Sequence, residues 1–331
     1  MTVLKPGPGC AVFVMPYFAD TTLSREYFTK AVTSLQEQSD PNWQLVVIND
    51  ASPREDEVRF LERIAGTEAR IKLLHQPRNA GPGVCRNLGT AWANEIGADI
   101  VLFHDADDVS HPRRLELTRR IFADRPEVDM VYSSFRVIDE NDCIVSCSAL
   151  TPSISEILEA HKENPVEGAN AWIRIGTETG YTTQTSTVAV RSRLAIAQPF
   201  PDVRGSEDSH TWYRMCADGN ILAFMPEITS LHRVPRGLDS SDRARVGRER
   251  YYRMLVDMNI DGFKKARDIA LRRRAISPEQ ASEIYPAFLR RLAVTVRREQ
   301  EFALAESLVA EAASAVDGLG LPCRMANPAA G

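Results

Sequence analysis

The sequence predicts an α/β protein with a mostly parallel central sheet and a C-terminal helical extension. Apolar, β-rich runs alternate with amphipathic helical segments over residues 10–108, which is the pattern of βαβ units and a parallel sheet. Residues 128–234 mix strand and helix patterns, and the chain beyond residue 236 has an almost wholly helical pattern. A chain of 331 residues is long enough for one large domain or two modest ones.

The first third of the chain supplies four expected strands and the helices between them. Pro16 closes the first apolar run, and Asn49 and Asp50 end the second. Gly66 follows an amphipathic stretch where a helix C-cap is expected. The expected strands cover 10–16, 43–49, 70–76 and 99–103, and the expected helices cover 23–38, 54–66 and 81–97.

The middle of the chain has a different order of elements. We expect a hairpin from 128–138 and 143–149, a threonine-rich strand over 182–194 and a short helix over 209–219. The stretch "RVPRGLDSSD" separates this part from the helical tail. We therefore predict two domains, a ligand-binding domain over 1–235 and a helical region over 236–331.

Composition excludes several classes of protein. The apolar content of 44% and charged content of 26% are ordinary for a globular chain. The net charge of -5 disfavours nucleic acid as a partner. The longest apolar runs are too short to span a bilayer, and the start of the chain lacks a secretory signal pattern. Six cysteines without disulfide-framework spacing favour a reduced, cytoplasmic setting.

The stretch "DIVLFHDADDVSHPRR" places three carboxylates at the end of a core strand. Asp105, Asp107 and Asp108 follow the fourth expected strand, and Asp50 follows the second. Ligands of parallel sheets bind at the carboxyl ends of the strands, so these groups are expected at one edge. Clustered carboxylates suit a hard cation such as Mg²⁺ or Mn²⁺. Alone, the run is more typical of a solvated turn than of a metal site.

The preceding segment "NAGPGVCRNLG" completes a recognisable pattern. Its Asn79, Gly81 and Arg86, followed by a strand and an Asp-x-Asp, resemble the large bacterial family 2 of inverting glycosyltransferases with the GT-A fold. The family run is N-x-G-x-x-x-A-R-N-x-G, and this chain departs from it only at Cys85. Further similarity lies in "VFVMPYF", "SLQEQSDPNWQLVVINDAS", "FPDVRGSEDSHTWYRMCADG" and "LHRVP", so the resemblance covers roughly residues 10–235.

The resemblance implies a role for each matched residue. Asp208 is expected to be the catalytic base, and Asp107 and His232 are expected to hold Mn²⁺ or Mg²⁺. Glu207 is expected either to bind the acceptor or to adjust the pKa of Asp208, and Trp212 either to pack in the core or to line the acceptor side. The residues expected to bind the nucleotide or donor are Pro16, Phe18, Asp50, Asn79, Gly81, Arg86, Asp105 and Arg233. The family's usual Asn and first Asp are replaced by Ala19 and Asn49.

The implied function is metal-dependent, inverting transfer of a sugar from a nucleoside diphosphate sugar, favouring a UDP-sugar, to an acceptor hydroxyl. The acceptor stays open between a small molecule, a glycan end and a lipid-linked glycan. Arginines of "DRARVGRER", with Arg233 and Arg236, are candidates for a lid over the diphosphate. The helical tail is expected to make a homodimer contact, cover the acceptor site or touch a membrane surface.

Two other functions remain as alternatives. A catalytically inactive nucleotide-sugar-binding module would use the same fold, although retention of Asp107, Asp208 and His232 speaks against it. A sugar nucleotidyltransferase would want a glycine-rich phosphate loop after the first strand, and "MPYFAD" has no glycine.

Overall fold

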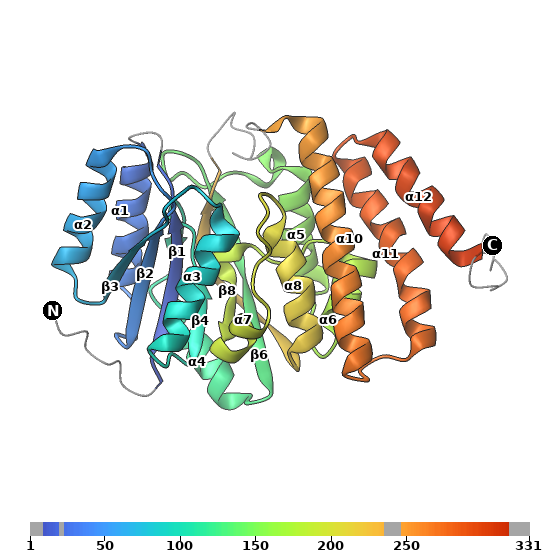
Figure 1. The fold of residues 1–331 in the computed structure, drawn as a ribbon, viewed down its shortest axis with the longest axis horizontal. Coiled ribbons are helices and arrows are strands. Elements are labelled where there is room, and N and C mark those ends of the chain that lie inside the picture. The colour runs from blue at the N-terminus through green and yellow to red at the C-terminus, as the bar shows by residue number, and fades with distance from the viewer. Residues whose placement is uncertain (1–8, 20–22, 235–245, 318–331) are drawn as a thin grey trace.

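The computed structural model describes residues 9–19, 23–234 and 246–317, and Figure 1 shows a central sheet with helices on both faces and a helical bundle at one side. The first half contains β1 (Ala11–Tyr17), α1 (Leu23–Gln36), β2 (Trp43–Asn49), α2 (Glu55–Thr67), β3 (Ile71–His75), α3 (Pro82–Glu95) and β4 (Ile100–Phe103). These elements confirm the strands and helices expected over residues 10–103. Helix α2 continues to Thr67, past the expected cap at Gly66.

The second half adds shorter elements and three long helices. It contains β5 (Val109–Ser110), α4 (Arg114–Asp124), β6 (Val128–Ile138), η1 (Cys147–Ala149), α5 (Pro152–Glu163), α6 (Ala171–Arg174), η2 (Ile175–Thr179), η3 (Thr185–Thr187), β7 (Ala189–Arg191), α7 (Ser192–Ala197), α8 (Glu207–Asp218) and β8 (Ile221–Arg233). The last described helices are α10 (Arg248–Arg272), α11 (Pro278–Arg298) and α12 (Phe302–Asp317).

The sheet has the strand order β3-β2-β1-β4-β7-β6-β8-β5. Strands β1 to β4 are parallel to one another, whereas β7 is antiparallel to both of its neighbours. Strand β8 runs parallel to β6. The carboxyl ends of β1, β2, β4, β6 and β8 therefore lie at one edge of the sheet, where α/β proteins bind their ligands.

Two expected strands of the middle region were wrong. Residues 143–149 make a single bridge, from Ile144 to Ile138, because the Asp139 carboxylate closes a turn on the backbone N–H groups of Asn141 and Cys143. The edge of β6 pairs with β8 instead. The strand expected over 182–194 is divided into η3, β7 and α7.

Alternate side chains of the central strands enter two separate cores. Val12 and Val14 of β1 pack with α3, α8 and the C-terminal helices, whereas Phe13 and Met15 pack with α1, α2 and α4. The period of two in a strand produces this division. The same β1 thus supports both helical layers.

Helix α10 crosses α8 at close range. A Cβ added to Gly262 would lie 2.7 Å from the Cα of His210. The two helices can therefore approach this closely only because residue 262 has no side chain. Behind it, the rings of Phe263 and Phe288 stack at a centroid distance of 4.0 Å. The expected domain boundary at residue 235 lies outside the described residues and stays a prediction.

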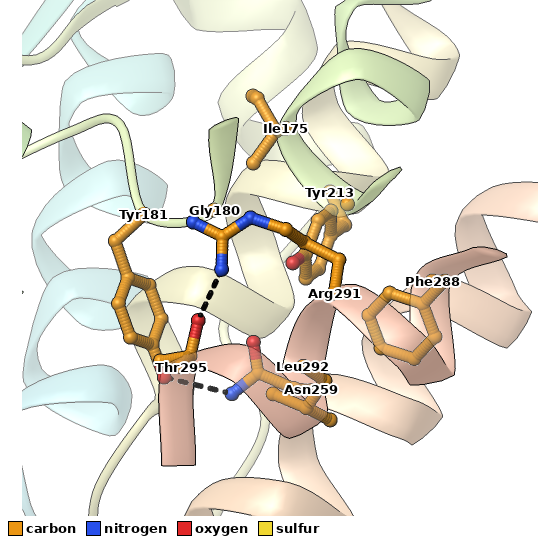
Figure 2. Close-up of a pocket in the computed structure, with 10 residues that line it drawn as sticks. Ile175, Gly180, Tyr181, Tyr213, Asn259, Phe288, Arg291, Leu292 and Thr295 are labelled. Carbon is orange, nitrogen blue, oxygen red and sulfur yellow. Dashed lines mark hydrogen bonds between the residues drawn. The ribbon is translucent and has the colours of Figure 1, made fainter. Parts of the chain in front are cut away.

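Helix α11 is attached to η2 and α5 by Arg291, at the centre of Figure 2. Its guanidinium donates to the carbonyls of Glu178 and Thr179 at 2.7 and 2.6 Å and forms an ion pair with Glu156. The adjacent cavity of about 10 Å³ is large enough for one water molecule. Within the described ranges, no helix is long and apolar enough to cross a membrane.

Candidate active site

The site is built where strand ends meet the beginnings of α3 and α8. Asp50 follows β2, the Asp105–Asp108 run follows β4, and His232 lies at the end of β8. Arg86 comes from α3, and Glu207 and Asp208 occupy the first turn of α8. The structure thus brings together groups that are far apart in the sequence, as the parallel-sheet topology predicts.

Asp50 fixes the glycine-rich turn that opens α3. Its two carboxylate oxygens accept hydrogen bonds from the backbone N–H groups of Ala80 and Gly81, at 2.7 and 2.8 Å. Gly81 has a φ of 92°, a conformation that glycine adopts without strain. Asn79 is held from the other side by Arg204. These contacts give the turn one conformation beside the end of β2.

Arg86 joins two carboxylates from different parts of the chain. One guanidinium nitrogen donates to Asp105 and another to Glu207, both at 2.8 Å. Arg86 is only 4% exposed, and its guanidinium lies over the Phe200 ring, 5.3 Å from the centroid. Paired charges of this kind are tolerated in an interior because each one satisfies the other. Arg86 is therefore an internal bridge between the end of β4 and the start of α8.

Glu207 and Asp208 are adjacent but differ in their surroundings. Burial raises the pKa of Glu207 to about 7, against the opposing charge of Arg86. Burial also raises the pKa of Asp208, whose half-buried carboxylate accepts the backbone N–H of Ser209 at 2.7 Å. A carboxylate with a raised pKa is a better proton acceptor than an ordinary one. The expected role of Asp208 as a general base is compatible with this raised pKa and stays a prediction.

Asp108 and His232 form a buried pair on the other side of the cluster. Asp108 is 0% exposed and its Oδ1 lies 3.1 Å from His232 Nδ1. Burial alone would lower the pKa of His232, but the carboxylates of Asp108, Asp107 and Asp105 raise it to about 9. The pair is a charge-assisted hydrogen bond in a protein interior. Sequence reasoning expected His232 beside Asp107, and the structure pairs it with Asp108.

Asp107 lies at the exposed surface of the turn. Loss of hydration around its carboxylate, together with the charges of Asp108 and Asp105, raises its pKa to about 7. The buried Oε1 of Gln184 has no hydrogen-bond partner in the described part of the chain. A positively charged group beside these residues would offset the repulsion between the three carboxylates and could pair with the Gln184 oxygen.

The donor chemistry fits a hard divalent cation. Carboxylate oxygens and an imidazole nitrogen are suitable ligands for Mn²⁺ and Mg²⁺. No three His, Cys, Asp or Glu side chains in the described ranges are grouped as a preformed metal site. The residues still suit such a cation without a preformed group, since Mg²⁺ commonly uses one or two protein carboxylates with water and substrate phosphates.

Two residues expected on the acceptor side are buried in the structure. Trp212 is 4% exposed and packs against Phe103 and Phe200, so its ring offers no face to an acceptor. The carboxylate of Glu207 is buried and forms an ion pair with Arg86, so it is not exposed for contact with an acceptor. The structure thus favours core packing for Trp212 and the contact with Arg86 for Glu207, and their expected positions on the acceptor side stay predictions.

Arg233 is also fixed in place. Its guanidinium donates to the carbonyls of Asp107 and Asp139 at 2.8 and 2.9 Å and lies over the Tyr27 ring. Since the side chain is 0% exposed, it is not available to close over a diphosphate. Most of the expected lid, 236–245, lies outside the described residues. Phe18 remains available at the strand-end edge, with 42% of its surface exposed.

Sequence reasoning missed two residues of the site. The Gln184 amide donates to Asp108 at 2.9 Å, and the Ser186 hydroxyl accepts the backbone N–H of Asp105 at 2.9 Å. Both belong to the polar run "YTTQTST", most of which lies in the strand expected over 182–194. The run contains no charged residue that would mark a site in the sequence. Only the tertiary contacts of Gln184 and Ser186 show that they belong to it.

Known proteins resemble this chain in sequence and in fold. The family model described as "Glycosyl transferase family 2" matches residues 13–185, which is more than half of the chain. The chain belongs to glycosyl transferase family 2. A glycosyltransferase of Nostoc sp., itself uncharacterised, is 28% identical to this family 2 chain over 209 residues, covering 62% of this chain and 58% of the relative.

Two solved structures have the same fold as this family 2 chain. Residues 1–349 of S. aureus TarS, in a complex with UDP-GlcNAc, have a TM-score of 0.58 at 17% identity, covering 95% of this chain and 93% of that piece. The mannosyltransferase PcManGT of Pyrobaculum calidifontis, in a complex with GDP-Man and Mn²⁺, has a TM-score of 0.52 at 17% identity, covering 95% and 88%. The chain spans less than two thirds of the length of the curated relatives compared with it.

Proposed function

We propose that this chain transfers a sugar from a nucleoside diphosphate sugar, a UDP-sugar in particular, to an acceptor hydroxyl with inversion at the anomeric carbon. The observation that carries the proposal is the position of Asp208. Its half-buried carboxylate has a raised pKa and lies within electrostatic range of Arg86 and Asp105, at the ligand-binding edge of the sheet. The family membership supports the reaction class.

The reaction is a single displacement. Asp208 accepts the proton of the acceptor hydroxyl while the hydroxyl oxygen forms a bond to the anomeric carbon. At the same time the bond from that carbon to the diphosphate oxygen breaks. The electron pair leaves with the nucleoside diphosphate. A positioned general base contributes about 10²–10⁴-fold to the rate. Because attack and departure occur on opposite faces, the anomeric configuration inverts.

The donor is proposed to occupy the edge formed by β1, β2 and the turn before α3. Phe18 presents an exposed ring there, and the turn of Asn79 and Gly81 is held rigid by Asp50 and Arg204. Pro16 lies near the end of β1, shortly before that ring. An exposed aromatic ring beside a fixed backbone is suited to stacking of a base.

We further propose that Asp107 and His232 would hold Mn²⁺ or Mg²⁺, with Asp105 facing the ribose or the water shell of the ion. Bound there, the ion would supply Lewis-acid stabilisation of the charge on the departing diphosphate. The Mn²⁺ bound with GDP-Man in the PcManGT structure supports this assignment. Asp108 joins the two proposed ligand-bearing segments through its contact with His232, and Arg86 ties Asp105 to the start of α8.

The partners and location are proposals of the same kind. The acceptor is a small molecule, a glycan end or a lipid-linked glycan, and nucleic acid is not among the expected partners. A cytoplasmic location, contact with a membrane surface and a homodimer formed through the C-terminal helices remain to be tested.

A donor screen tests the proposal directly. Nucleoside diphosphate sugars are added with and without Mn²⁺, and thermal unfolding is measured, since stabilisation follows RT ln(1 + [L]/Kd). The expected result is one donor that stabilises the chain and does so less after EDTA. If the donor that stabilises the chain most gave the same stabilisation after EDTA, the metal assignment would be contradicted.

Substitution of the base tests the chemical step. Asp208→Asn is expected to reduce turnover about 10²–10⁴-fold and to leave the donor affinity in the thermal assay unchanged. Transfer by Asp208→Asn at the wild-type rate would refute the proposed base. Binding of the donor by the wild type without transfer to any acceptor would favour an inactive binding module.

A further inference from the structure

Asp108 lies beneath the proposed metal site, and three polar groups lie within hydrogen-bond distance of its carboxylate oxygens. Gln184 Nε2 lies 2.9 Å from its Oδ2, the backbone N–H of Arg233 lies 2.8 Å from its Oδ1, and His232 Nδ1 lies 3.1 Å from the same oxygen. The carboxylate is fully buried. An ionised carboxylate only accepts hydrogen bonds, so each of these three groups is a donor.

This arrangement determines which nitrogen of His232 carries the proton toward Asp108. Nδ1 must donate to the carboxylate, because the ionised Asp108 oxygen 3.1 Å away can only accept, and Gln184 Nε2, 3.2 Å from Nδ1, is also a donor and cannot take that proton. The His232 ring also meets the Phe135 ring edge-on, with centroids 6.0 Å apart and an interplanar angle of 84°. The ring is thus held both at Nδ1 and by the Phe135 ring. Within the described ranges the hydrogen-bond contacts of the imidazole involve Nδ1, so Nε2 is the nitrogen left for a ligand.

We propose that Asp108 is the positioning residue that makes His232 a metal ligand, and that Gln184 in turn holds Asp108. The inference rests on the proposed metal-dependent function. Histidines that bind metals commonly donate their other ring N–H to a carboxylate, which fixes the ring orientation and raises the basicity of the ligating nitrogen. The adjacent carboxylates of the Asp-x-Asp-Asp run then have separate tasks. Asp107 is exposed and would hold the ion, whereas Asp108 is buried and contacts the histidine.

A merely structural pair would have the same hydrogen bonds, so the test must measure the metal itself. We would titrate Mn²⁺ into the full chain with saturating UDP, or with the nucleoside diphosphate that the donor screen identifies. Free Mn²⁺ is followed by its electron paramagnetic resonance signal. The variants are Asp108→Asn, Gln184→Met and His232→Gln.

Asp129→Asn is the matched control. Asp129 is likewise 0% exposed and accepts hydrogen bonds from the backbone and side chain of Asn220, both at 2.9 Å. It lies at the start of β6, at the opposite edge of the sheet from the site. It therefore reports what removal of a buried carboxylate does to the fold in general.

Asp108→Asn is expected to weaken Mn²⁺ binding about 10–100-fold, the usual effect of losing such a partner. His232→Gln should weaken it at least as much, and Gln184→Met less than Asp108→Asn. Asp129→Asn should bind Mn²⁺ as the wild type does. Thermal unfolding of each variant identifies any that fails to fold.

The inference is overturned if folded Asp108→Asn binds Mn²⁺ within twofold of Asp129→Asn. If Asp108→Asn does not fold, Gln184→Met decides, because it leaves the carboxylate and the histidine in place. Affinity of Gln184→Met equal to the wild type would then refute the proposal. A wild type that binds no Mn²⁺ with any nucleoside diphosphate would instead refute the metal-dependent function.

Discussion

Replacement of Arg86 by methionine tests the electrostatic bridge at the centre of the site. Methionine keeps much of the length of the side chain but leaves Glu207 and Asp105 without their cation. The side chains of Arg86 and Glu207 are 5% and 7% exposed, whereas that of Asp105 is 28% exposed. Water can therefore replace Arg86 at Asp105 far better than at Glu207. The loss should come chiefly from the Arg86–Glu207 pair.

The expected magnitude follows from that burial. Removing one partner of a buried ion pair costs about 3–5 kcal/mol, because the remaining charge is uncompensated. Arg86→Met should lower the free energy of unfolding by about this amount. The double variant Arg86→Met/Glu207→Gln should recover part of the loss, with a coupling of about 0.5–3 kcal/mol for groups in contact. Urea unfolding followed by tryptophan fluorescence measures the two single variants and the double variant.

The loss should depend on pH in a defined direction. Burial raises the pKa of Glu207 from 4.5 to about 7, so the folded chain binds this proton more tightly than the unfolded chain. The contribution of Glu207 to stability is therefore fully present below pH 4.5 and is lost as pH rises toward 7. Without the opposing charge of Arg86 the pKa rises further, and Arg86→Met should be least harmful in acid.

Two results would refute this reasoning. A change in unfolding free energy below about 1 kcal/mol, the range of an exposed pair, would mean that water reaches the Arg86–Glu207 contact. Strict additivity of the two substitutions would mean that the residues do not depend on each other.

Three further predictions concern other parts of the molecule. Phe18→Ala should weaken binding of the nucleoside diphosphate by about 1–3 kcal/mol if the ring stacks on the base, whereas Phe302→Ala, at another exposed ring, should not; calorimetry compares them. The value of kcat/KM should rise with pH as Asp208 ionises, with a midpoint above 3.8 because burial raises its pKa, and a profile flat down to about pH 4 would contradict its role as base. Gly262→Ala should destabilise by about 1–3 kcal/mol through the clash with α8, whereas Gly66→Ala, with open space around the added Cβ, should be neutral or stabilising; equal melting temperatures would contradict the close crossing.

The N-terminal half of the fold could be predicted because its signals are local. Val12, Val14 and the other buried residues of the central strands form continuous apolar runs, and each run is bounded by polar or turn residues. Such strands are buried on both faces and need no distant information to be recognised. The carboxylates of Asp50 and Asp105 follow these strands directly, so their common edge was also predictable.

The middle region could not be predicted in the same way. Residues 143–149 have the composition of a strand, but the edge of β6 is occupied by β8, which comes much later in the sequence. Competition between two possible partners for one strand edge is decided by the whole sheet. Local propensity for a strand therefore gave the wrong partner here.

The sequence by itself determined the family, the α/β class and which residues carry the candidate chemistry, because motif identity and apolar periodicity are written in consecutive positions. Only the tertiary structure decided how those residues are paired. It joined His232 to Asp108, committed Glu207 and Arg86 to each other, and buried Trp212 and Arg233. Two adjacent carboxylates look alike in a sequence, but neighbouring positions in a turn can face solvent or the interior, and burial then determines which of them can bind a ligand and which must bind another side chain.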